Sequence, residues 1–291
     1  MFIRAMPFLF ILSWASGFPI TRLGLEYTEP FTLLWIRSAI VIAIVGTYAL
    51  IVRVPWPDWK ETAHIAVVGV TLQCLYLGSM FMALDGNVSQ GVAALMAGMQ
   101  PLLTAAVVGF ALGERVSRLQ WVGFALGFIG LFIVLSERMG VGAGTVTGFV
   151  FAGLTPIFIT AASLYQKKFC ANSDLRVVMI VQQTAAGICN FLIAMAIETG
   201  EIEWSGELIF VWLWLVFILT IGATNLLYLM LRIGEAARVS GLFYLTPPTA
   251  VLLGWITYGE TMGWVALGGF AVAVAGVFLI TRNTGAADDQ S

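Results

Sequence analysis

Charge is scarce in this chain. Only 10% of its 291 residues are Asp, Glu, Lys or Arg, whereas 60% are hydrophobic and the mean hydropathy is +0.95. Soluble domains carry about 25% charged residues, and a soluble core has no room for so much apolar side chain. A soluble globular protein is therefore excluded. The net charge of −2 says little, because in a membrane protein the side on which each charge lies matters more than the sum.

Residues for metal and thiol chemistry are also few. The single histidine, His64, and the dispersed Cys74, Cys170 and Cys189 give no metal-ligand spacing and no CxxC pair. We expect no metal and no cofactor, and cysteines that fill apolar gaps. A lipid-acting membrane enzyme would need a nucleophile with its base, paired carboxylates or metal ligands. We find no such set, so an enzyme is not expected, and neither is a nucleic-acid partner.

Long apolar runs dominate what is present. About 20 apolar residues cross a bilayer as a helix, and the runs are continuous rather than alternating, which favours helices over a membrane barrel. The fold class is therefore all-α integral membrane protein with ten transmembrane helices. The ten runs are 5–22, 31–52, 62–83, 88–111, 118–136, 147–167, 176–198, 208–230, 237–258 and 263–281.

A motif repeats along the chain. Gly113-Glu114 recurs as Gly259-Glu260, and the same offset of 146 residues pairs Pro101 with Pro247. The chain therefore divides into two five-helix units, 1–137 and 143–282, followed by a tail, 283–291. The apolar run near the N-terminus also resembles a signal peptide, but the doubled architecture needs it as its first helix.

The basic residues are distributed unevenly between the two ends of these helices. With the N-terminus in the cytoplasm, 11 of the 14 Lys and Arg residues lie on the cytoplasmic side. Both termini are therefore assigned to the cytoplasm of a multi-pass protein, and we expect this protein in a bacterial inner membrane. Because five is odd, the second unit enters from the opposite side, and the repeat is inverted, a recurring construction of transporters.

Polar and aromatic residues within the spans are candidates for a substrate cavity, because lipid does not solvate polar groups. Interhelical packing is the competing interpretation, and it stays open for the amides. Tyrosines near helix ends often anchor a protein at the membrane–water interface. Those that lie deeper in the spans could instead line the cavity. The candidates are Trp14, Ser16, Gln73, Tyr76, Met80, Met96, Met99, Gln100, Tyr165, Gln183, Asn190, Asn225, Tyr228 and Tyr244.

Three prolines are candidates for helix bends that take part in gating. Pro101 and Pro247 lie within spans at matching positions, and Pro248 follows directly. A proline inside a helix removes one backbone hydrogen bond, and matched interruptions point to a transport site. A static kink is the alternative. Glycines spaced along 118–136 and 263–281 predict that these two helices pack closely.

Arg37 is the only basic residue within a span, near its outer end. It either extends to the outer surface or pairs with an acidic group there, such as Glu26 or Asp85. No carboxylate lies near the middle of any span, which favours passive transport over proton exchange. We expect no cation in the cavity, which argues against phosphorylated or nucleotide-linked substrates, since these need Arg or Lys.

Several of these features together resemble a known family. They are Ser13-Trp14-Ala15-Ser16, Arg37, Gln100-Pro101, the Gly-Glu turns and the ten spans in two halves. The chain is similar to EamA-type members of the drug/metabolite transporter superfamily, and among them to bacterial amino-acid exporters of the YddG type. The resemblance implies export of amino acids, aromatic ones included, through a central cavity by alternating access.

The sequence therefore predicts an exporter of aromatic and other mainly apolar amino acids, embedded in the lipid bilayer, with a monomer favoured. The alternatives are an exporter of drugs or hydrophobic metabolites and, more remotely, a membrane enzyme acting on lipid.

Overall fold

The computed structural model describes residues 2–88, 93, 96–136, 144–246, 248–249 and 263–281. Within these ranges the chain is helical apart from turns and one isolated antiparallel bridge between Thr28 and Ile202. The elements, in chain order, are α1 (Phe2–Gly24), α2 (Pro30–Val52), α3 (Trp59–Gly69), η1 (Val70–Tyr76), α4 (Leu77–Asp85), α6 (Gln100–Leu112), α7 (Arg118–Ser136), α8 (Val146–Cys170), α9 (Leu175–Ile197), α10 (Gly206–Trp214), η2 (Leu215–Thr224), α11 (Asn225–Ile233), α12 (Ala236–Gly241), η3 (Leu242–Leu245) and α14 (Trp264–Thr281).

Membrane-length helices follow the apolar runs of the sequence. Five helical stretches in the described ranges are long and apolar enough to cross a bilayer: Pro30–Val52, Trp59–Asp85, Val146–Cys170, Leu175–Ile197 and Gly206–Ile233. Large apolar side chains such as Phe110, Leu50 and Trp264 are exposed on the outer faces. Exposed apolar surface on this scale is what lipid covers, so the fold is an all-helical membrane bundle.

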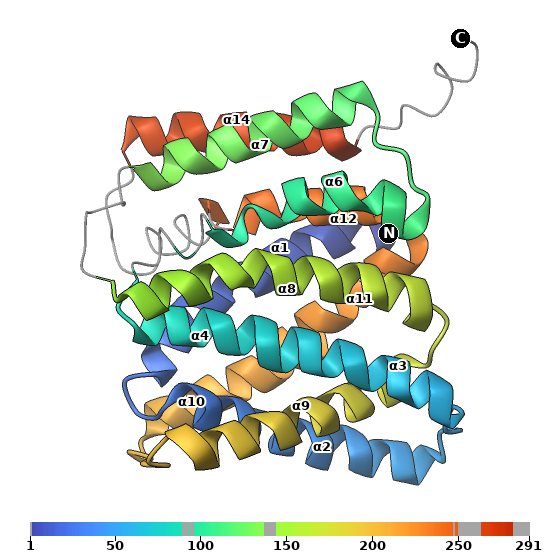
Figure 1. Ribbon diagram of the computed structural model, residues 1–291, viewed down its shortest axis with the longest axis vertical. Helices are drawn as coiled ribbons and strands as arrows, with labels where there is room; N and C mark the ends of the chain where they lie inside the picture. The colour runs from blue at the N-terminus through green and yellow to red at the C-terminus, as the bar shows by residue number, and fades with distance from the viewer. Residues whose placement is uncertain are drawn as a thin grey trace.

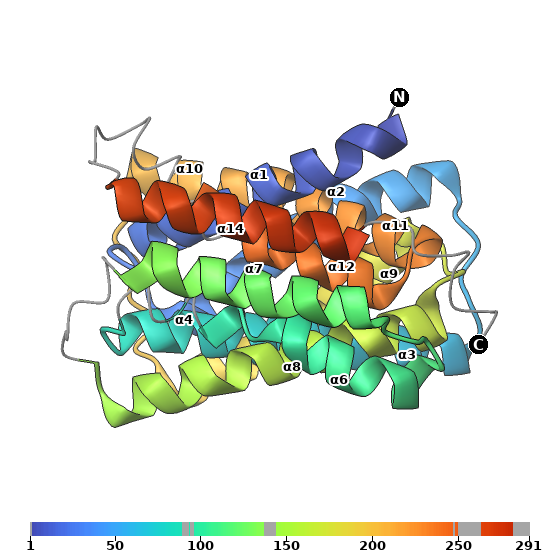
Figure 2. The same cartoon turned by 90° about the horizontal axis from the view of Figure 1, so that it is seen from above.

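The helices lie side by side with their axes running in roughly the same direction (Figures 1 and 2). Helices α7 and α14 form one edge of the bundle, and α2, α9 and α10 form the other (Figure 1). Between them lie α1, α8 and α11, together with the stretch from α3 to α4. The turn between α1 and α2 and the end of α4 lie at one end of the bundle, which we name the turn end.

Glycines allow the backbones of α7 and α14 to approach each other closely. A Cβ atom on Gly276 would come within 2.4 Å of the backbone nitrogen of Gly127, and one on Gly130 within 2.7 Å of the carbonyl oxygen of Gly269. Only glycine permits such an approach of two backbones. The predicted packing between these two helices is confirmed.

The Gly-Glu turn after α6 contacts two other helices, α8 and α12, through Glu114. Gly113 ends α6 with φ of 72°, a left-handed conformation that favours glycine. The carboxylate of Glu114 lies 2.6 Å from Nζ of Lys167 on α8 and accepts a hydrogen bond, at 3.0 Å, from the backbone nitrogen of Ala236 at the start of α12.

Two membrane-length stretches contain π-helical segments in their middle. Segment η1 joins α3 to α4, and segment η2 joins α10 to α11. Shifting Val70–Tyr76 by the repeat offset of 146 residues places it inside Leu215–Thr224. The same irregularity therefore occurs twice, at positions related by the repeat offset, and π-helical turns occur frequently at functional sites.

Pro101 lies beside an interruption of its span. Residues 96–97 are helical, Gly98 and Met99 form a turn, and helix α6 begins at Gln100, so Pro101 lies in the first helical turn. Proline fits this position because the first backbone N–H groups of a helix have no intrahelical partner. A part of Pro101 in gating stays a prediction. Pro248 is buried in a helical conformation, while Pro247 lies outside the described residues.

Candidate functional site

A cavity of about 60 Å³ lies between α1, α2, the two π-helical segments and α4. Its lining is mainly leucine, phenylalanine and methionine, among them Met80. Besides leucine, phenylalanine and methionine, the lining consists of Trp14, Gly17, Thr21, Arg37, Gln73, Tyr76, Thr220 and Thr224. The volume holds a few water molecules, which take about 30 Å³ each in the liquid. Pockets that enclose drug-sized ligands measure roughly 300–1,000 Å³, so a bulky ligand requires a wider state.

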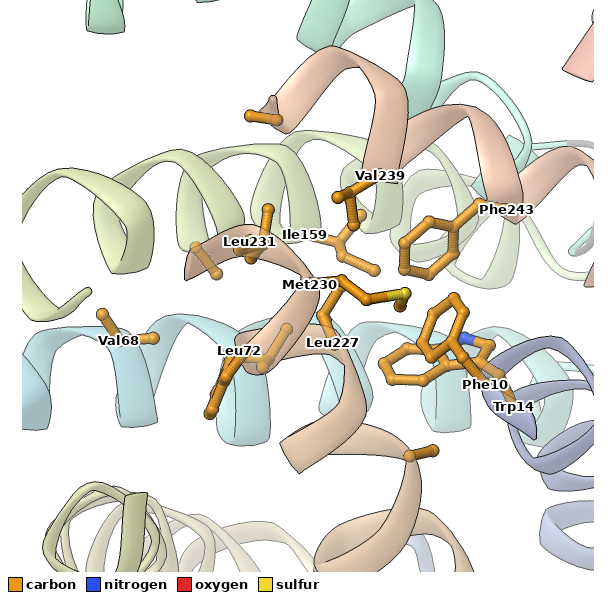
Figure 3. Packing of buried hydrophobic residues seen from close by; sticks show 14 of the residues in the cluster. Phe10, Trp14, Val68, Leu72, Ile159, Leu227, Met230, Leu231, Val239 and Phe243 are labelled. Carbon is orange, nitrogen blue, oxygen red and sulfur yellow. The ribbon is translucent and has the colours of Figure 1, made fainter. Parts of the chain in front are cut away.

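The cavity has a floor of aromatic rings on the side away from the turn end. The ring of Trp14 lies 6.4 Å from that of Tyr76 and nearly parallel to it, and 5.2 Å from that of Phe243. Phe10 and Met230 pack beside Trp14 in the same buried cluster (Figure 3). Trp14 is 8% exposed and Phe10 is 0% exposed. The far end of the bundle is therefore closed by tightly packed side chains.

A second, smaller cavity of about 10 Å³ lies on the other side of this floor. Trp14, Phe18 and Tyr76 line both cavities, and Phe243 and Thr246 line only the smaller one. Three aromatic side chains therefore separate the two spaces.

Arg37 is part of the cavity wall. It is 3% exposed, its Nη2 donates a hydrogen bond of 2.9 Å to Oε1 of Gln73, and its Nε is buried without a partner. It neither extends to the surface nor pairs with Glu26 or Asp85, as the sequence had suggested. Its distance from the bundle end, two helical turns into α2, explains why it does not reach solvent. The expectation of a cavity without cations is wrong, because Arg37 lines the cavity.

Two threonines of η2 donate their hydroxyl protons to backbone carbonyl oxygens of the same segment. The hydroxyl of Thr220 donates to the carbonyl oxygen of Leu215 at 2.9 Å, and that of Thr224 donates to Leu219 at 3.1 Å. Both bonds reach five residues back, as the wider π-helical turn allows. Because each hydroxyl has donated its only proton, its oxygen atom can act only as a hydrogen-bond acceptor at the cavity wall.

Of the fourteen residues expected in a cavity, Trp14, Gln73, Tyr76 and Met80 line the main one. They come from α1 and from the stretch η1–α4, where Gln73, Tyr76 and Met80 follow helical spacing.

Other expected cavity residues connect helices. Gln183 accepts a hydrogen bond of 2.9 Å from Ser38, and Nδ2 of Asn190 donates to the carbonyl oxygen of Gln73 at 3.4 Å. The hydroxyl of Tyr228 donates to Gln182 at 2.6 Å, and Gln182 donates in turn to Gln166. These contacts are those of interhelical packing in membranes.

The remaining candidates are engaged locally or lie elsewhere. They are Ser16 (bonded to Ser13 and to Trp214), Asn225 (bonded to Ile221), Gln100 (bonded to Thr104), Tyr165 (bonded to His64), Tyr244 (buried against Gly127), Met96 (packed in a core cluster) and Met99 (38% exposed). None of them lines the main cavity.

Several cavity residues were absent from the expected set. Thr21, Thr220 and Thr224 line the cavity, yet single threonines in a span are usually packing residues. The spacing of Trp14, Gly17 and Thr21 along one face of α1 is the signal that would have found Thr21.

The sequence model of the EamA-like transporter family matches residues 4–136 and again residues 146–282. The chain belongs to the EamA-like transporter family. Membership agrees with the all-helical bundle and with the resemblance to the drug/metabolite transporter superfamily.

Relatives of this EamA protein carry the names of transporters rather than enzymes. A "Probable amino-acid metabolite efflux pump" of Salmonella typhimurium is 23% identical over 94% of this chain and 93% of its own. A "Probable terminal-alkyne amino-acid exporter" of Streptantibioticus cattleyicolor is 24% identical over 95% and 92%. The "Uncharacterized inner membrane transporter YedA" of Escherichia coli is 25% identical over 94% and 89%.

A solved structure supports the fold of this EamA protein. One crystal structure, described only as that of a protein, superposes with a TM-score of 0.78 at 20% identity and covers 95% of this chain and 96% of its own. The likeness concerns the fold alone.

Proposed function

We propose that this EamA protein exports aromatic and other mainly apolar amino acids from the bacterial cytoplasm by alternating access. The observation that carries the proposal is the cavity between the two π-helical segments, one from each unit, with Trp14, Gln73, Tyr76 and Met80 in its wall. Its apolar lining suits an apolar side chain, and its few polar groups suit a zwitterion. The names of two relatives, an amino-acid metabolite efflux pump and an amino-acid exporter, agree with this cargo.

Alternating access requires two units that can move against each other. We propose ten spans in two inverted five-helix units, 1–137 and 143–282. The contacts between α7 and α14 support this arrangement, since Gly123 meets Gly276 and Gly130 meets Gly269. Each pair maps onto the other under the 146-residue offset, and the two helices run antiparallel. Such contacts fit a two-fold axis that crosses the helix direction, which in a membrane lies in its plane.

The proposed orientation places both termini in the cytoplasm and the turn end outside. The excess of Lys and Arg at the opposite end supports it. In this orientation the cavity lies toward the outside, and the rings of Trp14 and Phe243 separate it from the cytoplasm.

Transport by the purified protein in proteoliposomes tests the proposal. We expect counterflow of labelled phenylalanine and methionine above that of empty liposomes, with threonine as a more polar comparison. The apolar lining also fits a second candidate function, the export of drugs or hydrophobic metabolites. Inhibition of phenylalanine counterflow by a lipophilic cation, rather than by other amino acids, would favour this candidate. No counterflow of any amino acid would refute amino-acid export. Repeating the assay with and without a proton gradient shows whether transport is coupled to protons.

A further inference from the structure

We propose that Arg37 binds the carboxylate group of the cargo. The cavity would then select compounds with one carboxylate on an apolar body, a class that includes the apolar α-amino acids. This inference rests on the proposed transport function and adds the group that recognises the cargo.

The first argument is the isolation of the charge. Arg37 is 3% exposed, and the only hydrogen bond of its guanidinium within the described ranges goes to the neutral amide of Gln73. Nε has no partner, and no ion pair of Arg37 is found in those ranges. A cation buried at membrane depth is costly unless it is paired, and unpaired ones mark substrate pathways. A bound carboxylate supplies the missing counter-charge.

The second argument is the shape of the donor group. Guanidinium is planar and presents its N–H groups as a fork that matches the two oxygens of a carboxylate. Gln73 holds one arm of this fork through Nη2 at 2.9 Å. Asn190 donates to the backbone carbonyl oxygen of Gln73, and this bond ties η1 to α9 at that residue. Gln73 therefore acts as a positioning residue for Arg37.

The third argument is the complementarity of the remaining wall. The hydroxyl oxygens of Thr220 and Thr224 are acceptors, because their protons are donated along η2, and acceptors are what an ammonium group needs. Leu72 and Leu219 offer an apolar surface to the side chain of the cargo. A zwitterion satisfies all three parts, whereas a compound with only a positive charge is repelled by Arg37.

The test compares Arg37→Gln with Arg53→Gln in the full-length protein in proteoliposomes. Arg53 ends the same helix and is exposed, so its substitution removes the same charge outside the cavity. We expect Arg37→Gln to raise the half-saturating concentration of phenylalanine about 10- to 100-fold, the range of a charge-assisted hydrogen bond. Arg53→Gln leaves it unchanged, and Arg37→Lys gives an intermediate value. Phenylalaninamide, which lacks the carboxylate, is transported poorly by the unmodified protein and no worse by Arg37→Gln.

A second variant separates loss of binding from loss of folding. Gln73→Glu places a carboxylate of the protein beside Nη2 of Arg37. This carboxylate pairs with the guanidinium group and so competes with the carboxylate of the cargo. We expect phenylalanine transport to be lost, while the thermal unfolding temperature in detergent stays the same or rises. Full transport by Arg37→Gln or by Gln73→Glu overturns the inference.

Ligand-induced thermal stabilisation distinguishes this inference from the proposed cargo. Phenylalanine and phenylpropionate are expected to stabilise the unmodified protein but not Arg37→Gln. If no amino acid is transported but phenylpropionate stabilises the protein through Arg37, amino-acid export fails and carboxylate binding stands. If neither compound stabilises the unmodified protein more than phenylalaninamide does, the inference on Arg37 is overturned.

Discussion

Trp14 lies between the two cavities and lines both of them. Its ring faces Tyr76 on one side and packs edge-on against Phe243 on the other. Phe10 fills the space toward the far end, 5.2 Å from Trp14 and 5.1 Å from Phe243. Large aromatic side chains bury much area in fixed geometry, and Trp14 is one of the three, with Phe18 and Tyr76, that line both cavities.

Trp14→Ala is therefore expected to join the two cavities and weaken the barrier. We expect liposomes containing this variant to lose preloaded phenylalanine at least several-fold faster, without a trans substrate, than liposomes with the unmodified protein. Trp14→Phe keeps a ring in place and serves as the control. Equal leak rates for Trp14→Ala and Trp14→Phe would show that the barrier lies elsewhere.

At the scale of helices, the contact between α7 and α14 depends on the absence of side chains. Gly276→Ala brings a methyl group within 2.4 Å of backbone atoms of Gly127, so the two helices must separate. We expect a loss of about 1–3 kcal/mol in unfolding free energy, as for overpacked cores, visible as a lower unfolding temperature in detergent.

Gly268→Ala is the matched control on the same helix. A Cβ atom there meets nothing within 4 Å, and alanine favours helix over glycine by about 1 kcal/mol. The two substitutions should therefore shift the unfolding temperature in opposite directions. A similar decrease for both would show that the close contact is unimportant for stability.

The far end of the bundle is held shut by a polar contact as well as by rings. Lys167 binds Glu114 at 2.6 Å and also donates to the carbonyl oxygen of Gly234. The pair joins the turn after α6 to α8 and to the start of α12. It lies near Cys170, which is buried at 0% exposure.

Lys167→Met should increase the population in which this end is open. With Cys74 and Cys189 replaced by alanine, we expect Cys170 to react with a maleimide about fivefold faster, which corresponds to about 1 kcal/mol for a partly exposed ion pair. Lys168→Met, which removes an exposed neighbour, should leave the rate unchanged. A rate that does not respond to Lys167→Met would mean that this contact does not hold the end shut.

The ranges of several helices could be predicted from the sequence, but the turn at Gly98 and Met99 inside the predicted span 88–111 and the contacts inside the cavity could not. Apolar runs such as 31–52 and 118–136 follow directly from hydropathy, and α2 and α7 occupy them within one residue. The π-helical segments have no such signature, so the direction of Thr220 was not foreseen. Tyr244 and Asn190 show the limit of residue type: both are polar groups in spans, and both contact neighbouring helices outside the main cavity.

At the scale of the whole molecule, the proposed orientation makes a prediction about sidedness. Lys60 and Glu203 are exposed at opposite ends of the bundle. In a cysteine-free background, Glu203→Cys should react with a membrane-impermeant maleimide in intact cells, and Lys60→Cys only in inverted vesicles. Labelling of both from the same side would contradict the bundle topology, and the reverse pattern would contradict only the orientation.

The duplication could be recognised from the sequence because glycines at fixed spacing recur in both units. Arg37 shows why the function of a single residue was harder to predict. The sequence places it in a span, but its nearest partner, Gln73, is on another helix, and only the fold brings them together.

The π-helical segments have one further consequence. A π-helix and an α-helix formed by the same residues satisfy the backbone in different registers, with bonds five or four residues apart. Conversion of η1 or η2 to α-helix would turn the rest of that span by about 100° for each residue of shift, and nearly every backbone N–H group would still find a carbonyl, as lipid demands. Such a conversion would rotate the cavity-lining part of the span about its own helix axis without breaking the backbone hydrogen bonding. Because η1 and η2 lie at matching positions, each half of the molecule contains one segment in which this rotation can occur.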